Sequence, residues 1–318
     1  MTKNWLKIIL LASIGATAAL AEAARYPVID AHSQFDEDVS VEQVVRLTRQ
    51  AGIQSVIIAA RGETSSEQIV KLVQQYPGCF VPAVRSKGRS YDENRKGYYR
   101  MLEEQLTMPG FKAMAEILLV HAPKGKRAPE VNVAVTSPQA QAAISAAIAR
   151  GWPVVLHYEF RWLGQTRGEK AKAERLQELE SLLRQHPSHP FALIHLGQLD
   201  ASEASELLAR HANLHLLTSH ANSLIDEKSK QPWSLMLADG KITPEWRAVL
   251  LRHPDRFILA FDNVWPEHWG EPYSQQAALW QQALQDLPEA SAHALSHGNA
   301  ERLWRLGPAE KTVCQPKD

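Results

Sequence analysis

Short runs of β-type residues alternate with longer helical patterns along most of the chain. In residues 40–51, Val41, Val44, Val45 and Thr48 recur at three- and four-residue spacing, which is typical of a helix that buries one face against a sheet. We expect strands at residues 27–32, 54–59, 79–84, 111–117, 153–157, 191–195, 214–218 and 256–261. We expect the helices that follow them at about residues 40–51, 65–76, 91–107, 137–150, 169–186, 201–211, 243–253 and 273–286.

Capping and stop residues support several of these boundaries. Ser65 and Gln68 have the spacing of a capping box, and Pro244 occupies the first position of a predicted helix. Gly52 and Gly151 stand where a helix is expected to stop. The helical assignments therefore rest on end signals as well as on periodicity.

Eight strand–helix pairs in one domain are the count of a (β/α)8 TIM barrel. The rival fold, an open doubly wound sheet, would usually carry a Gly-rich first turn, and no G-x-G-x-x-G follows any predicted strand. We therefore predict a barrel over residues 24–306 and a C-terminal tail at 307–318. The longest irregular stretches, at about 118–136 and 219–242, fall on the side of the barrel where such folds build their active sites.

The N-terminus has the pattern of a cleaved signal peptide. Lys3 and Lys7 precede an apolar run at residues 8–20, and small residues follow it with Ala-x-Ala spacing. We expect residues 1–23 to be removed, which leaves a protein that is periplasmic or secreted; an uncleaved anchor helix is the alternative. Later runs are too short or too polar to span a membrane, so we expect no membrane contact after cleavage.

Charge and cysteine content exclude several classes of protein. Basic and acidic residues number 35 each, without a basic block, which argues against nucleic acid and against an electrostatic membrane surface as partner. Cys79 and Cys314 are too few for a disulfide scaffold, although an oxidising compartment would allow one bridge between them.

Polar residues with metal-binding side chains follow five of the predicted strands. They are His32, Glu116, His157, His195 and Asp262. The C-terminal ends of barrel strands converge on one mouth, so these side chains are expected to become neighbours. Imidazoles and carboxylates together are ligands for zinc or a similar divalent ion. A single histidine at a strand end is more often structural, and only the set of five indicates a metal site.

Several segments resemble motifs of the amidohydrolase superfamily, in its amidohydrolase-2 branch of TIM-barrel metal-dependent hydrolases and decarboxylases. Four segments are similar to the strand-1, strand-5, strand-6 and strand-8 motifs of this superfamily. In that order, they are Val28-Ile29-Asp30-Ala31-His32, Pro153-Val154-Val155-Leu156-His157, Leu193-Ile194-His195-Leu196-Gly197 and Leu259-Ala260-Phe261-Asp262. Residues 297–304 look like the C-terminal signature of the branch. The resemblance spans the chain after its leader, in the expected order.

This resemblance implies one divalent metal ion, with zinc as the expected element. Glu116, His157 and His195 match its ligands, with His32 as a fourth residue that helps. Asp262 matches the residue that accepts a proton from water as it attacks a carbonyl group.

One position departs from the pattern of the superfamily. Its first strand usually carries His-x-His, whose two side chains point to the same face, whereas here the second position is Gln34. A glutamine oxygen is a weaker ligand for zinc than an imidazole. A paired-metal centre is therefore not expected.

Four further residues are candidates for the mouth of the barrel. His220 follows the seventh strand and is a candidate catalytic acid or oxyanion donor. Arg85 and Arg161 follow the third and fifth strands, where a guanidinium group can bind a substrate carboxylate through two hydrogen bonds. Trp265 follows the eighth strand and is a candidate pocket wall, although packing a loop onto the barrel is the more common role of such a tryptophan.

The predicted function is that of an exported metal-dependent hydrolase. It would use a metal-activated water on an amide, ester or lactone carbonyl of a small molecule. Three alternatives stay open: a decarboxylase of a carboxylated ring, a metal-free lactonase, and a non-catalytic periplasmic binding protein of the same fold. A homodimer is compatible with each of them.

Overall fold

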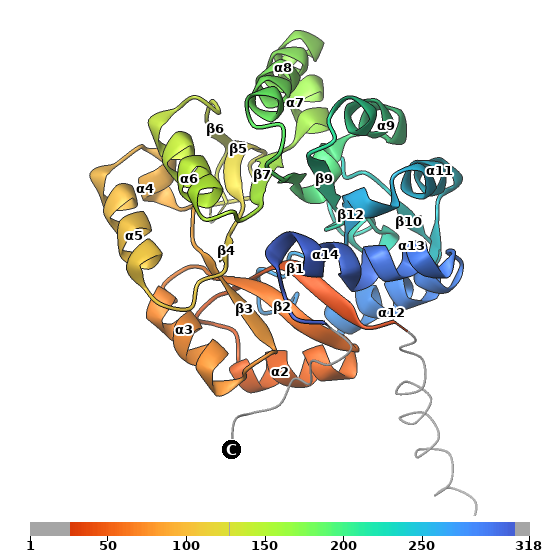
Figure 1. The fold of residues 1–318 in the computed structure, drawn as a ribbon, viewed down its shortest axis with the longest axis horizontal. Coiled ribbons are helices and arrows are strands. Elements are labelled where there is room, and N and C mark those ends of the chain that lie inside the picture. The colour runs from red at the N-terminus through yellow and green to blue at the C-terminus, as the bar shows by residue number, and fades with distance from the viewer. Residues whose placement is uncertain (1–25, 127, 309–318) are drawn as a thin grey trace, which may run out of the picture.

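Eight barrel strands follow one another in chain order in the computed structural model, which describes residues 26–126 and 128–308. They are β1 (Val28–Phe35), β2 (Ile53–Ala60), β3 (Phe80–Val84), β4 (Ala113–Met114) continued by β5 (Ile117–His121), β7 (Val154–Tyr158), β8 (Phe191–Leu193), β9 (Leu214–Leu217) and β12 (Phe257–Ile258). Neighbouring strands of the barrel pair in parallel. In Figure 1 they curl around a common centre with helices outside them.

Backbone hydrogen bonds close the strands into a barrel. β1 to β4 form one sheet, β5, β7, β8, β9 and β12 lie together in a second, and β4 leads into β5. At the other seam, the Ala31 N–H donates to the carbonyl of Leu259 at 3.0 Å. The Asp262 N–H donates to the carbonyl of His32 at 2.8 Å. The predicted (β/α)8 fold is therefore confirmed.

Helices cover the outside of the barrel. They are α2 (Val41–Gln50), α3 (Ser66–Gln75), α4 (Arg89–Asp92), α5 (Lys96–Thr107), α6 (Pro138–Ala149), α7 (Phe160–Arg167), α8 (Glu169–Gln185), α9 (Ala201–Arg210), α10 (Ser223–Asp226), α11 (Pro244–Arg252), α12 (Glu271–Gln285), α13 (Glu289–His293) and α14 (Asn299–Trp304). The capping box predicted for Ser65 and Gln68 is present at the start of α3. Gly52 and Gly151 take φ values of 69° and 64°, which favour glycine after a helix end.

Two apolar layers hold these elements together. The larger lies between the strands and the helices, and the smaller fills the interior of the barrel. In the interior layer, side chains such as Ile57 and Val155 pack with small alanines and with Leu303 and Trp304 of α14. α14 therefore closes one end of the barrel, and it crosses the centre of Figure 1. The site must lie toward the opposite end, where the strands finish.

The two stretches predicted to be irregular contain short strands. β6 (Val131–Asn132) pairs antiparallel with β5, and β10 (Leu237–Ala238) pairs antiparallel with β11 (Lys241–Ile242). The sixth strand is shorter than predicted because β8 leads directly into the 3-10 helix η1 (Ile194–Gln198), and the eighth pairs with β9 only over Phe257–Ile258. The remaining short turns are η2 (Pro254–Arg256) and the π-helical η3 (Ala294–Gly298).

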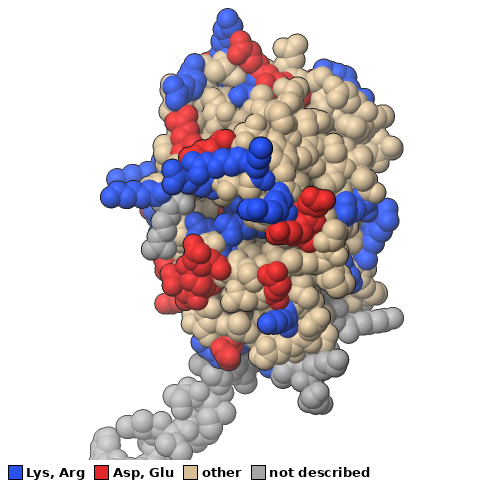
Figure 2. All heavy atoms as spheres, turned by 90° about the vertical axis from the view of Figure 1, so that its left-hand side faces the viewer, with Lys and Arg blue, Asp and Glu red and all other residues tan. Residues whose placement is uncertain are grey.

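Charged side chains of both signs lie close together on the face shown in Figure 2. Across 26–126 and 128–308, no helix combines the length and apolar character needed to cross a membrane. The predicted signal peptide at residues 1–23 lies outside the described residues, and so does Cys314, with which Cys79 could form the one bridge that the sequence allows.

Candidate active site

Five strand-end residues predicted from the sequence come together at one mouth of the barrel. His32 lies on β1, Glu116 between β4 and β5, and His157 on β7, while His195 and Asp262 follow β8 and β12. All five are buried. The possible ligand atoms of Glu116, His157 and His195 lie within 4.8 Å of one another, and so do those of His32, Glu116 and Asp262. The barrel thus gathers residues that are far apart in the sequence.

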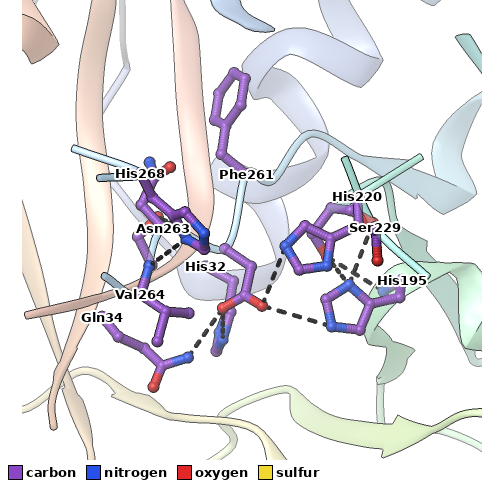
Figure 3. A network of polar contacts seen from close by, with 12 residues as sticks. His32, Gln34, His195, His220, Ser229, Phe261, Asn263, Val264 and His268 are labelled. Carbon is purple, nitrogen blue, oxygen red and sulfur yellow. Dashed lines mark hydrogen bonds and ion pairs between the residues drawn. The ribbon is translucent and has the colours of Figure 1, made fainter. Parts of the chain in front are cut away.

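Asp262 lies at the centre of a polar cluster. Its Oδ1 atom accepts a hydrogen bond from Gln34 Nε2 at 2.9 Å and lies 3.3 Å from His32 Nε2. Its Oδ2 atom lies 3.5 Å from His195 Nε2 and 3.7 Å from His220 Nε2. Figure 3 shows these four side chains converging from different parts of the barrel. Burial alone would raise the pKa of Asp262, but the neighbouring His32 outweighs it and keeps this pKa well below its usual range.

Three residues of the cluster have an unusual backbone conformation. The φ angles of His195, His220 and Asp262 are 55°, 60° and 55°, in the left-handed region that residues with a side chain seldom adopt. Such conformations persist only where surrounding contacts enforce them, and they gather at functional sites. Here the His195 N–H donates to Ser219 Oγ at 3.2 Å, which is one of the enforcing contacts.

A buried carboxyl group fastens β1 to the chain on both sides of Asp262. Asp30 accepts hydrogen bonds from the Phe261 N–H at 3.0 Å and from Ser33 Oγ at 2.6 Å. Ser33 Oγ in turn accepts from the Asn263 N–H at 3.1 Å. Asp30 and Ser33 therefore hold the backbone before and after Asp262 against β1.

Glu116 is a buried carboxylate with partners on both of its oxygens. Its Oε2 atom lies 2.5 Å from His157 Nδ1, and its Oε1 atom forms an ion pair with Lys87. Gln34 Nε2 lies 3.4 Å from the same Oε1 atom. Burial would raise the pKa of Glu116, but Lys87, His157 and His32 together outweigh burial and keep this pKa well below its usual range. Glu116 is therefore an ionised carboxylate.

The histidines of the cluster differ in charge. Burial would lower the pKa of His32, but Asp262 and Glu116 outweigh it and raise this pKa to about 9. Burial, aided by repulsion from His220, lowers the pKa of His195 well below its usual range. At neutral pH, His32 is therefore cationic and His195 is a neutral imidazole, the form that binds metals.

A family model described as amidohydrolase matches residues 15–306 of the chain. This protein belongs to the amidohydrolase family. The resemblance seen in the sequence motifs is confirmed. Comparison with curated proteins gives no match.

Solved structures share the fold of this amidohydrolase at low sequence identity. A 2,6-dihydroxybenzoate decarboxylase in complex with 2,6-dihydroxybenzoate is similar with a TM-score of 0.56 and 13% identity, over 88% of this chain and 99% of the other. A zinc-bound amidohydrolase from Burkholderia multivorans gives 0.52 and 13%, over 88% and 99%. A TIM-barrel protein from Bordetella bronchiseptica gives 0.51 and 15%, over 90% and 100%. At these identities the likeness supports the fold alone.

The remaining predicted site residues of this amidohydrolase make contacts outside the cluster. The guanidinium of Arg85 donates to the carbonyls of Gly62 at 2.9 Å and Lys87 at 3.2 Å. That of Arg161 donates to the carbonyl of Trp233 at 3.1 Å. Among the described residues, neither arginine forms an ion pair with the cluster.

Aromatic rings wall parts of the mouth. The Trp265 ring lies beneath the Arg61 guanidinium at 3.7 Å. The ring centroid of Trp233 lies 4.7 Å from that of His195 and 4.8 Å from that of His220. Trp233 is therefore in direct ring contact with two histidines of the cluster.

Three charged residues at the site, Glu159, Lys124 and Lys87, were not predicted from the sequence. Glu159 Oε1 lies 2.8 Å from His157 Nε2 and forms an ion pair with Lys124, and Lys87 pairs with Glu116. A signal for Glu159 was present, since it stands two residues after His157 at a strand end, where the side chains share a face. The two lysines lie beyond strands, and their positions depend on loop conformation.

The donor set of the site suits a divalent ion. Glu116, His157 and His195 offer one carboxylate and two imidazoles, a mixture that zinc and similar ions accept. Buried His220 Nδ1 also has no hydrogen-bond partner among the described residues, and buried His32 Nε2 has only the ion-pair contacts with Asp262 at 3.3 Å and Glu116 at 3.6 Å. Buried polar atoms of this kind are usually satisfied. The residues present therefore fit the metal that the sequence motifs imply.

Proposed function

We propose that this amidohydrolase is a metal-dependent hydrolase that acts on an amide, ester or lactone carbonyl of a small molecule. The observation that carries the proposal is the convergence of Glu116, His157 and His195 within 4.8 Å, beside the carboxylate of Asp262. From the pattern of residues 1–23 alone, we further propose that the enzyme acts outside the cytoplasm.

Glu116, His157 and His195 would hold the ion, and His32, which faces Glu116 and Asp262, would assist once it has released its proton. A divalent ion in such a site acts as a Lewis acid toward the substrate carbonyl and toward water. Neutral His195 and ionised Glu116 already have the protonation states that ligation requires. His157 must release the Nδ1 proton that it shares with Glu116, so ion binding is expected to strengthen as the pH rises.

Asp262 would accept the proton of the attacking water. It is ionised at neutral pH, and Gln34 and His32 hold its Oδ1 atom, which leaves Oδ2 toward His195 and His220. Burial lowers the pKa of His220 to about 4, so this imidazole is neutral. His220 can therefore donate a hydrogen bond to the carbonyl oxygen or pass a proton to the leaving group.

Metal analysis of protein purified without chelators tests the proposal. We expect about one equivalent of a divalent ion in the wild type and loss of that ion in His157→Asn and His195→Asn, because a mononuclear site needs each of its few protein ligands. His189→Asn is the matched control, since His189 bonds to the carbonyl of Trp152 at 2.9 Å away from the cluster. A metal-free wild type that still hydrolyses lactones would overturn the proposal in favour of a metal-free lactonase.

Decarboxylation is the second candidate, and Lys87 and Lys124 favour it. Their side chains are 19% and 25% exposed and reach the edge of the cluster, where an ammonium group can bind a substrate carboxylate. Arg85 and Arg161 bind main-chain carbonyls outside the cluster, whereas both lysines already stand beside its carboxylates. Release of CO2 from carboxylated phenols, lost in Lys87→Met and Lys124→Met, would favour this candidate over hydrolysis.

A further inference from the structure

We infer that Glu159 is a positioning residue, which holds the His157 ring so that Nδ1 faces Glu116 and His195. This inference rests on the proposed metal site and adds a residue to it. Neither the sequence motifs nor the family match assigns a role to Glu159.

Both nitrogens of His157 are engaged in the buried site. Nδ1 lies 2.5 Å from Glu116 Oε2, and Nε2 lies 2.8 Å from Glu159 Oε1. If the ring flipped or turned, Nε2 would lose its carboxylate partner, and an unsatisfied buried polar group is costly. A hydrogen bond to the far nitrogen of a ligating histidine fixes both its tautomer and its orientation. Glu159 supplies that hydrogen bond here.

Glu159 is itself held from two directions. Its Oε2 atom accepts a hydrogen bond from the Ala122 N–H at 2.8 Å, and its Oε1 atom forms an ion pair with Lys124. The side chain is fully buried, and Glu159 directly precedes α7. A carboxylate fixed in this way offers His157 a rigid acceptor. The segment that follows β5, which contains Ala122 and Lys124, is thereby connected to the site.

A role as a metal ligand is the competing explanation. His121, His157 and Glu159 do offer possible ligand atoms within 4.8 Å of one another. However, His121 Nδ1 already bonds to the carbonyl of Pro129 at 3.0 Å, and both oxygens of Glu159 have partners. An ion at this position would have to displace Lys124 or His157 from Glu159. Positioning requires no such rearrangement.

Zinc affinity, measured by competition with a chromophoric chelator, tests the inference. We expect Glu159→Ala to weaken binding about 10- to 100-fold, because loss of such an outer partner has that effect. Glu159→Gln should weaken it less, since its amide oxygen still accepts from Nε2–H and its shape preserves the fold. Glu130→Gln is the matched control, because Glu130 pairs with Arg167 at 2.9 Å on the surface. We expect that variant to bind like the wild type.

A spectroscopic signature separates positioning from general loss of structure. In ¹⁵N NMR of the zinc-loaded protein, the Nε2–H of His157 should exchange slowly in the wild type and in Glu159→Gln. The signal should broaden or vanish in Glu159→Ala. If the wild type binds zinc and both Glu159 variants bind it with the same affinity, the positioning role is overturned and the proposed function stands. If the wild type binds two equivalents of zinc and the Glu159 variants lose only the second, Glu159 is a metal ligand and the positioning role is overturned. A wild type without bound ion would overturn the proposed function as well.

Discussion

Replacing Asp30 with asparagine is expected to remove a pH dependence from the stability of the barrel. Asp30 is fully buried between β1 and the chain around Asp262, where it accepts hydrogen bonds from the Phe261 N–H and from Ser33. Burial raises its pKa from 3.8 to about 7, despite these hydrogen bonds. The carboxyl group is therefore easier to protonate in the folded protein than in the unfolded chain.

The sign and size of the effect follow from this pKa. Between pH 3.8 and about 7 the folded protein binds more protons than the unfolded chain, so the free energy of unfolding falls as the pH rises. The contribution of Asp30 is fully present below pH 3.8 and is lost as the pH rises through about 7. The shift corresponds to about 4 kcal/mol. Asparagine has no proton to release, so Asp30→Asn should lack this contribution.

Urea unfolding of chelator-treated protein at several pH values measures the effect. The free energy of unfolding of Asp30→Asn, relative to that of the wild type, should increase by up to about 4 kcal/mol between pH 4 and pH 7.5. Asp38→Asn is the control, since Asp38 is exposed near the same mouth, and it should keep the wild-type pH dependence. Equal pH dependence of unfolding in the wild type and in Asp30→Asn would contradict this prediction.

Two further changes test the catalytic site and the core. Asp262→Asn should lower kcat on a lactone or ester that the wild type hydrolyses by about 10²- to 10⁴-fold, because the proton acceptor is lost. Its zinc content should stay near that of the wild type, and an unchanged kcat would contradict the assigned role. Trp280→Ala should lower the free energy of unfolding in urea by about 3–5 kcal/mol, because this ring on α12 is fully buried. Leu235→Ala, at a residue 38% exposed, is the control; a similar loss in both would contradict the prediction.

The order and type of the elements could be predicted from the sequence. Periodicity and end signals depend on neighbouring residues, as in the capping box of Ser65 and Gln68 at the start of α3. A barrel places every strand end at one mouth, so the positions of His32 and His157 at strand ends were enough to predict that they meet. The end of the sixth strand was predicted less well, because His195 adopts a left-handed φ value that local sequence does not favour.

The partners of the site residues were decided only by the tertiary structure. Lys87 and Lys124 reach Glu116 and Glu159 from loops, whose paths depend on long-range contacts that no sequence spacing records. The candidate residues Arg85 and Arg161 donate to main-chain carbonyls, and these contacts also depend on the paths of the loops. Strand periodicity is local, so the sequence is enough to predict a barrel of eight strands with histidines and carboxylates at the strand ends. Which charged side chains face one another there depends on the fold, because a buried charge must pair with a group that the fold brings close to it.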